Sequence, residues 1–476
     1  MRAQSVWWMA AVGAALAGVG VALLPLEALF ALGAVLVGAF ALLDPALSLA
    51  LTLVLAPLQP LERIVLGFGL GSGQVMLSVA LIAYLLRALA TRRLCVHTWG
   101  MPISALLAAF ASIAFATFFV AQDAGEWLGE WVKWLQFGAV ALIVANASRR
   151  TRALLLGAVL VSGAIQAAAG FYQAVLRGTG PDEFLFVGSL ARYRAYGSFE
   201  QPNPFGGFMG LVWPVALGVS VGALRQRRWF VGASALLVAV GSIYALIASG
   251  SRGAFVGAAA AALALVLVAL PRPQVWALAA LTILLALYGF DRLNLPASIE
   301  AQVQAYMPNG ELDVRNAQVT PFTFSTIERL AHWQAALRMI EASPWLGVGL
   351  GNYAAAYPRF RLLPWENPLG HAHNYYLNVF AEGGVLGLLT YLAFWVATIA
   401  ITWRQARTEG ALGLMGGILG AWVHLSVHQL FDNLYVANMH LLLGAYLGFV
   451  MAQRAQRQTT PRAPAPLSHN ALQPAR

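Results

Sequence analysis

The sequence predicts an all-α polytopic integral membrane protein. Of its 476 residues, 60% are hydrophobic and only 10% are charged, whereas soluble domains carry about a quarter charged residues. A soluble chain of this length would divide into roughly three domains, and this chain has too few polar side chains to cover them. The apolar residues instead gather in runs near the ~20 residues that a membrane helix needs. These observations exclude a soluble enzyme and a disordered chain.

The apolar runs number 14, and we expect about 12 and at most 14 of them to span the membrane. Two early runs are short and meet at Asp44-Pro45, and the third reaches Pro57 and Pro60, so some early pieces are expected to be half-helices. A cleaved signal peptide is not expected, because only Arg2 precedes the first run and further runs follow at once. The runs cover residues 6–24, 26–43, 46–60, 74–90, 101–121, 128–147, 152–175, 204–223, 229–248, 253–270, 274–290, 384–403, 410–430 and 434–451.

The distribution of arginine predicts the orientation. The net charge is +10, and nearly all of the basicity is Arg. If the N-terminus is cytoplasmic and successive runs cross the membrane in alternating directions, the cytoplasmic side has 17 Arg and two acids. The outer side has 11 Arg, Lys133 and 17 acids. This follows the positive-inside rule, so both termini are expected in the cytoplasm and no nucleic-acid partner is expected. The single cysteine, Cys95, excludes a disulfide framework and a cysteine-based metal cluster.

Two outer segments are too long to be simple connectors. One is the arginine-bearing segment 176–203, within an N-terminal transmembrane part that covers 1–290. The other is 291–383, which we expect to form a large loop domain with one or two helices. Three transmembrane helices should then occupy 384–451, and 452–476 should be a disordered cytoplasmic tail.

The large loop contains one clear helix signal. The run Ser325–Glu328 fits a capping box, and the helix that it opens should end near Ser343. Arg329 and His332 lie three residues apart and so share a face of that helix. A Gly-x-Gly-x-Gly run at 347–351 permits tight turns, but it lacks the spacing of a dinucleotide-binding motif.

Three outer side chains are candidates for chemistry. His373 can accept a proton near neutral pH, the alternative being an interfacial histidine bonded to backbone. Arg194 can pair with phosphate oxygens, or extend to the lipid headgroups. Arg252 stands in a turn of small residues against the positive-inside trend, which makes it a functional candidate. The set fits a polyanionic lipid donor whose diphosphate is held by Arg while a His removes a proton from an acceptor hydroxyl.

A second polar set lies near the outer end of the penultimate run. His424, His428 and Asp432 are spaced four residues apart and share a helix face. A His-x₃-His pair can hold Zn²⁺, but a polar contact between helices is the favoured interpretation.

Three runs of residues, all on the outer side, follow one another in a distinctive order. They are Arg194-Ala195-Tyr196-Gly197 with Asn203-Pro204, then Ser251-Arg252-Gly253-Ala254, and then Arg329 and Trp333 through Pro344, Gly347, Gly349 and Asn352 to His373-Asn374 and Glu382-Gly383. In these runs, over about residues 190–390, the chain resembles the O-antigen ligase/polymerase superfamily of bacterial envelope glycosyltransferases. Each run is weak alone, but their order, spacing and common side make the combination specific.

The resemblance implies an all-helical protein of the bacterial inner membrane with about 12 spans and a periplasmic loop domain. By position, it implies that His373 is the essential loop histidine and that Arg194 and Arg252 are the two essential arginines. Arg192 and His371 duplicate the first arginine and the histidine, so each assignment can slip by two residues. The supporting residues that we expect are Arg192, Arg329, His371, Asn203, Asn374 and Glu382.

Members of this superfamily take a glycan from undecaprenyl diphosphate and pass it to lipid A–core (ligases), to another repeat unit (polymerases) or to proteins. The resemblance therefore implies undecaprenyl-diphosphate-linked O-antigen as donor, lipid A–core oligosaccharide as acceptor, inversion, and neither metal nor cofactor. The single large outer loop late in the chain favours an O-antigen ligase over a polymerase or a protein O-oligosaccharyltransferase. The alternative from another class is a lipid-linked glycan transporter, which would be expected to bind at the midplane between repeated halves.

Overall fold

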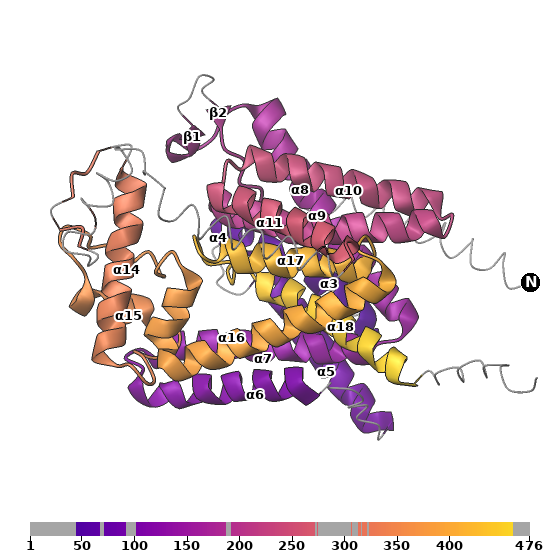
Figure 1. Cartoon of the computed structure of the whole chain (residues 1–476), viewed down its shortest axis with the longest axis horizontal. Helices are drawn as coiled ribbons and strands as arrows, with labels where there is room; N and C mark the ends of the chain where they lie inside the picture. The colour runs from indigo at the N-terminus through magenta and orange to yellow at the C-terminus, as the bar shows by residue number, and fades with distance from the viewer. Residues whose placement is uncertain are drawn as a thin grey trace, which may run out of the picture.

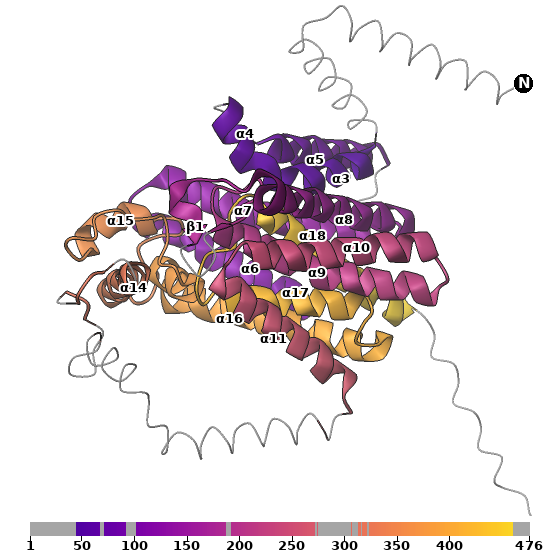
Figure 2. The same cartoon turned by 90° about the horizontal axis from the view of Figure 1, so that it is seen from above.

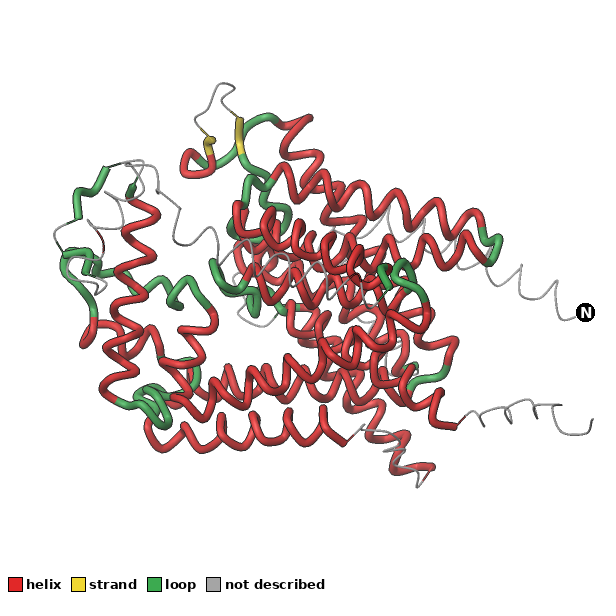
Figure 3. Tube along the Cα trace, in the orientation of Figure 1, coloured by secondary structure: helices red, strands yellow, loops and turns green. Residues whose placement is uncertain are grey.

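The computed structural model describes residues 44–66, 71–91, 101–186, 192–271, 274, 306, 313–315, 317–320 and 323–459. This part of the chain is almost entirely helical (Figure 3), which confirms the all-α prediction. One pair of two-residue antiparallel strands, β1 (Leu185–Phe186) and β2 (Arg192–Tyr193), interrupts it. The runs predicted at 6–24 and 26–43, and all but the first residue of 274–290, lie outside the described residues.

Nine helices of the described part are long and apolar enough to cross a membrane. This confirms a polytopic membrane protein, while the total of 12 to 14 spans stays a prediction. The spanning segments are formed by α3 (Pro45–Leu55) with η1 (Ala56–Leu58) and α4 (Gln59–Leu66), α5 (Ser72–Thr91), α6 (Met101–Ala116) with η2 (Thr117–Val120), α7 (Ala124–Asn146), α8 (Arg149–Phe171) with η3 (Tyr172–Arg177), α9 (Pro202–Arg225), α10 (Trp229–Ala248), α11 (Arg252–Ala269) and α16 (Tyr375–Glu409).

Helix α9 lies at the centre of the bundle (Figures 1 and 2). Its membrane window is 72% buried, whereas the other eight candidate spans are at most 44% buried. It packs against α10, α11 and the shorter apolar helix α17 (Leu414–His428). The remaining helices therefore shield α9 from lipid, and a side chain at either end of α9 is held by neighbours on several sides.

The early and late ends of the bundle differ in part from the prediction. Near Pro57, α3 passes through the 3-10 turn η1 into α4, and the three together form one candidate span over Pro45–Ile64 rather than a half-helix. At the other end, α18 (Met439–Thr459) packs along α7 and extends into the segment that was predicted to be a disordered tail. Helix α16 begins at Tyr375, well before the predicted start of its span at 384.

The described part of the large loop forms two helices, α14 (Phe324–Ala342) and α15 (Tyr353–Phe360), which lie beyond the ends of α6 and α16 (Figure 1). Helix α14 ends before Ser343, as predicted. The predicted capping box is wrong, because the helix begins at Phe324 with Thr323 as its N-cap residue. Thr320 N–H donates to Thr323 Oγ1 at 2.8 Å, and this turn starts the helix earlier than Ser325 would.

The glycine-rich run packs on a kink in α16. Gly384 has φ 62° and ψ −167°, and a Cβ there would lie 2.2 Å from the carbonyl carbon of Trp345, so only glycine fits. Val348 N–H donates to Ala381 O at 2.9 Å and Gly349 N–H donates to Glu382 O at 3.0 Å. The run thereby satisfies carbonyls that the kink exposes and fixes the loop domain against the start of α16.

A second anchor joins the loop domain to the transmembrane bundle. Asp123 N–H donates to Asn352 Oδ1 at 2.6 Å, and Asn352 Nδ2 donates back to Asp123 O at 3.0 Å. Leu350 N–H also donates to Thr117 Oγ1 at 3.0 Å. The spacing from Pro344 to Asn352 thus positions the loop domain rather than a ligand.

Candidate functional site

Arg194 is held by groups from two transmembrane helices. Ala195 N–H donates to Ala248 O at 2.9 Å, which brings the segment after β2 against the end of α10. The guanidinium then donates through Nε to Ser249 O and through Nη2 to Asn203 Oδ1, both at 2.7 Å. The predicted supporting residue Asn203 therefore orients Arg194.

The turn between α10 and α11 brings Arg252 to the same place. Gly250 has φ +61°, and a Cβ there would lie 3.3 Å from Arg194 Nε. Ser251 caps α11, its Oγ accepting from Ala254 N–H at 3.3 Å, so Arg252 is the first residue of the helix. The partial positive charge of a helix N-terminus adds to that of the guanidinium.

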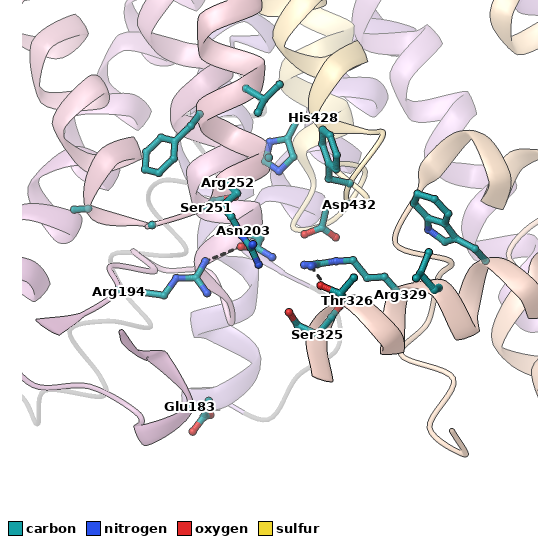
Figure 4. Close-up of a pocket in the computed structure, with 18 of the residues that line it drawn as sticks. Glu183, Arg194, Asn203, Ser251, Arg252, Ser325, Thr326, Arg329, His428 and Asp432 are labelled. Carbon is teal, nitrogen blue, oxygen red and sulfur yellow. Dashed lines mark hydrogen bonds between the residues drawn. The ribbon is translucent and has the colours of Figure 1, made fainter. Parts of the chain in front are cut away.

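A third arginine reaches the site from the loop domain. Arg329 of α14 points toward Arg252 from the side opposite Arg194 (Figure 4). Its Nη1 donates to Ser325 O at 3.5 Å, and its buried Nε has no hydrogen-bond partner among the described residues. Arg329 was predicted only as a supporting residue, and the structure places it with Arg194 and Arg252.

These three guanidiniums line a cavity of about 1120 Å³ between the transmembrane helices and α14. Two carboxylates, Glu183 and Asp432, also line it. Burial lowers the pKa of Arg194, the positive charges of Arg329 and Arg252 lower it further, and Asp432 opposes the shift. The arginines are thus close enough to repel one another, and a bound anion would relieve that repulsion. We name this the arginine cavity.

His373 lies beside the arginine cavity and faces Asp432. Its backbone has φ 51°, a left-handed conformation that is uncommon for a residue other than glycine and that often marks functional sites. His373 Nδ1 is 3.8 Å and His371 Nε2 is 3.6 Å from Asp432 Oδ1. Asp432 is 5% exposed. Burial raises its pKa, but His373, His371 and His428 together more than offset this, and its pKa lies well below the usual range.

The hydrogen bonds distinguish the two histidines. His371 Nδ1 accepts from His373 N–H at 3.0 Å, so a neutral His371 carries its proton on Nε2, toward Asp432. Burial lowers the pKa of His371 to about 4, although Asp432 opposes the shift. Nδ1 of His371 is therefore occupied, and Nε2 lies 3.6 Å from Asp432 Oδ1. In contrast, neither ring nitrogen of His373 has a hydrogen-bond partner among the described residues.

His371, His373 and Asp432 also present one ligand atom each within 4.8 Å of one another, which is a spacing that a metal ion can use. The Nδ1 hydrogen bond of His371 leaves an N–H rather than a lone pair toward that position. The arrangement consequently suits proton transfer better than metal coordination.

Sequence reasoning missed His332 as part of this site, although it noted that His332 shares a face with Arg329. The His332 ring stacks on Tyr357 at 4.7 Å and meets the His373 ring edge-on at 5.8 Å. Tyr353 Oη donates to His332 O, so His332 Nδ1 donates to Tyr353 Oη, both at 3.0 Å. Burial, followed by the charges of His373 and His371, lowers the pKa of His332 to about 3. His332 is therefore uncharged, and its ring packs against that of His373.

The other predicted supporting residues have structural contacts. Asn374 is the N-cap of α16 and accepts from Tyr376 N–H and Leu377 N–H. Buried Glu382 accepts from Tyr353 N–H at 3.1 Å and so holds α15. Arg192 lies in β2, and its side chain is outside the described part of the structure. These contacts orient the segments around His373.

The predicted polar face of α17 divides between two roles. His424 and His428 lie where α17 meets α9 and α11, with His424 Nε2 3.4 Å from His428 Nδ1. The His424 ring packs against Gly210 of α9 and Gly257 of α11, in agreement with the predicted contact between helices. Asp432 instead lies beyond the end of α17, beside His371 and His373. The sequence grouped Asp432 with His424 and His428, whereas in the structure its carboxylate faces His371 and His373, and His428 also lies close enough to influence its pKa.

Parts of the chain are similar in sequence to known proteins. Residues 237–392 match a family model described as O-antigen ligase, a range that contains Arg252, Arg329 and His373. The chain is also 29% identical over 167 residues to an O-antigen ligase of Pseudomonas aeruginosa strain PAO1. That match covers 35% of this chain and 34% of the relative, so it spans about a third of each protein. With the motifs and the helical fold, these matches support a relationship between this multi-pass membrane protein and the O-antigen ligase superfamily.

Proposed function

We propose that the chain is an O-antigen ligase, which transfers glycan from undecaprenyl-diphosphate-linked O-antigen to lipid A–core oligosaccharide at the periplasmic face of the inner membrane. The observation that carries the proposal is the arginine cavity beside the His373–Asp432 pair. A diphosphate is a compact polyanion, and guanidiniums bind its oxygens in pairs. A histidine beside it suits the activation of a hydroxyl.

The arginines act on the donor. Arg194, Arg252 and Arg329 would bind the diphosphate and stabilise the charge that develops as it leaves the sugar. Because Arg194 is already fixed by Ser249 and Asn203, little reorganisation is needed in the transition state. The three arginines supply the positive charge of the site without a metal or other cofactor.

His373 acts on the acceptor. Its Nε2 would take the proton of a core-sugar hydroxyl while that oxygen attacks the anomeric carbon. The new C–O bond forms as the bond from the anomeric carbon to the diphosphate breaks, and undecaprenyl diphosphate leaves. Asp432 stabilises the resulting imidazolium. Attack from the face opposite the diphosphate inverts the anomeric centre, and no carboxylate nucleophile takes part.

Purified protein in detergent, supplied with a polyprenyl-diphosphate glycan, tests this function. Lipid A–core is added to one sample and omitted from the other. We expect glycan on the core with the wild type. We expect a loss of about 100-fold or more for Arg252→Ala and for His373→Ala. Arg359→Ala is the control, because Arg359 is an exposed arginine of α15.

Each other outcome points to a different function. Longer glycan on the polyprenyl carrier would indicate a polymerase. Glycan on an added protein would indicate a protein O-oligosaccharyltransferase. A folded protein that forms no new bond in any sample would exclude the ligase and favour a lipid-linked glycan transporter.

A further inference from the structure

A second cavity of about 300 Å³ shares Asp432 with the arginine cavity. It is bounded by the start of α4, by residues 199–204 ahead of and at the start of α9, and by residues 432–437 after α17. His371 also lines it. The volume is at the lower end of the range of about 300–1,000 Å³ for small-molecule pockets. We name it the amide pocket.

The lining of the amide pocket combines polar and apolar groups. Gln201 and Asn433 offer amides, which both donate and accept hydrogen bonds. Asn433 Oδ1 accepts from Tyr435 N–H at 2.8 Å, which orients its amide. Phe199 and Val436 add apolar surface. A sugar ring matches this lining, because its hydroxyls donate and accept while its C–H faces pack on apolar side chains.

The charges of the two cavities differ. The arginine cavity has three arginines against Glu183 and Asp432. The amide pocket has one arginine, Arg63, which forms an ion pair with Glu200, and it also contains Asp432. A diphosphate is therefore attracted to the arginine cavity, and an uncharged polyol is the better ligand for the amide pocket.

We propose that the amide pocket binds the acceptor sugar, with the hydroxyl that is to be glycosylated directed toward the His373–Asp432 pair. This inference rests on the proposed transfer reaction. Because Asp432 lines both cavities and His373 Nδ1 lies 3.8 Å from its carboxylate, donor and acceptor would lie on either side of the carboxylate that positions His373. The ligand class is a hydroxyl-bearing saccharide.

The experiment measures KM for lipid A–core and for the polyprenyl-diphosphate glycan separately. In Gln201→Ala, we expect KM for the core to rise roughly tenfold, as for one lost hydrogen bond, with KM for the donor unchanged. Gln201 is exposed and makes no capping bond to α9, so this variant should fold. Val436→Trp should fill the pocket and abolish transfer, while undecaprenyl diphosphate still binds within twofold of the wild-type affinity.

Leu237→Trp is the control for the added indole, because Leu237 of α10 is 73% exposed, and it should leave both KM values unchanged. A rise in the donor KM, or no change in the core KM for Gln201→Ala, would overturn the acceptor assignment while leaving the ligase intact. If the wild type glycosylates a protein rather than a saccharide, the assignment also fails. A wild type that forms no bond at all would instead refute the proposed function.

Discussion

At the scale of single residues, the structure distinguishes two histidines that the sequence left equivalent. His371 and His373 both face Asp432, but only His371 accepts a backbone N–H. That bond occupies Nδ1 of His371, the nitrogen that would have to stay free to take a proton while Nε2 faces Asp432. His373 keeps Nδ1 for Asp432 and Nε2 for a substrate, so Asp432 becomes the residue that should position the base.

We predict that Asp432→Asn lowers kcat for glycan transfer by about 10²–10⁴-fold. The amide cannot stabilise a positively charged imidazole. Asp432→Glu keeps the negative charge, so it should recover part of the lost kcat. If Asp432 had only a structural role, the two variants would not differ in this way. Steady-state kinetics with limiting donor measure both variants. Asp313→Asn, at an exposed ion pair with Arg315, is the control, and equal activity of Asp432→Asn and wild type would contradict the role.

At the scale of elements, the loop domain is positioned by backbone contacts together with an apolar cluster of α14, α15 and the start of α16. The glycine-rich run bonds to the kink of α16, and Asn352 bonds to the backbone at the start of α7. These contacts determine where α14 presents Arg329 and His332. The spacing from Pro344 to Asn352, which appeared in the sequence as a motif, is therefore explained by these backbone contacts rather than by contact with a ligand.

We predict that Asn352→Ala destabilises this docking by about 1–3 kcal/mol. Asn352 is fully buried, and its loss leaves Asp123 N–H without its partner. The thermal unfolding midpoint in detergent should fall, and KM for the donor should rise because Arg329 is displaced. Asn367→Ala, in an exposed turn, should change neither. A lower midpoint with an unchanged donor KM would show that α14 does not depend on this anchor.

His332 makes the stability of the loop domain depend on pH. Its folded pKa of about 3 is below the value of about 6.5 for an unfolded chain. The stability that neutral His332 contributes is complete above about pH 6.5 and is lost as the pH falls toward about 3. We predict that His332→Phe reduces the loss of unfolding midpoint between about pH 7.5 and about pH 5.

His371, with a folded pKa of about 4, shifts stability in the same direction and remains in the variant. The pH dependence should therefore weaken without vanishing. The comparison is between slopes, because His332→Phe also removes the bond to Tyr353 and lowers the midpoint at every pH. Equal slopes for the variant and the wild type would mean that His332 is not held neutral by burial.

At the scale of the whole molecule, the site lies where the transmembrane bundle meets the loop domain (Figure 4). Arg194, Arg252 and Asp432 flank transmembrane helices at one end of the bundle, and Arg329 comes from α14. The arginine bias of the sequence orients this end toward the periplasm. That orientation is a prediction which labelling can test.

We predict that Trp345→Cys reacts with a membrane-impermeant maleimide in intact cells whose outer membrane admits the reagent. Gln226→Cys, in the turn between α9 and α10, should react only after the inner membrane is opened. Both positions are exposed, and Cys95 is replaced by Ser in both variants so that it adds no signal. The reverse pattern would place the active site in the cytoplasm and exclude the proposed periplasmic reaction.

The sequence by itself determined the membrane class, the end of the loop helix before Ser343, and the residue types of the site. Hydropathy, proline and charge bias are local properties, so they can be read along the chain. Arg194, Arg252 and His373 were also assigned from local motifs, and the structure places the two arginines in one cavity with His373 beside it.

The tertiary structure alone decided the partners. Asp432 follows His428 by four residues, and a helix would have kept them on one face, but α17 ends at His428 and the turn carries Asp432 to His371 and His373. Arg329 and His332 join the site because α14 packs with α15 and the start of α16 in one apolar cluster. Likewise, the amide pocket is assembled from residues 59–63, 199–204 and 369–371 with the 432–437 turn. Contacts between segments so distant in sequence depend on packing, and no local pattern specifies them.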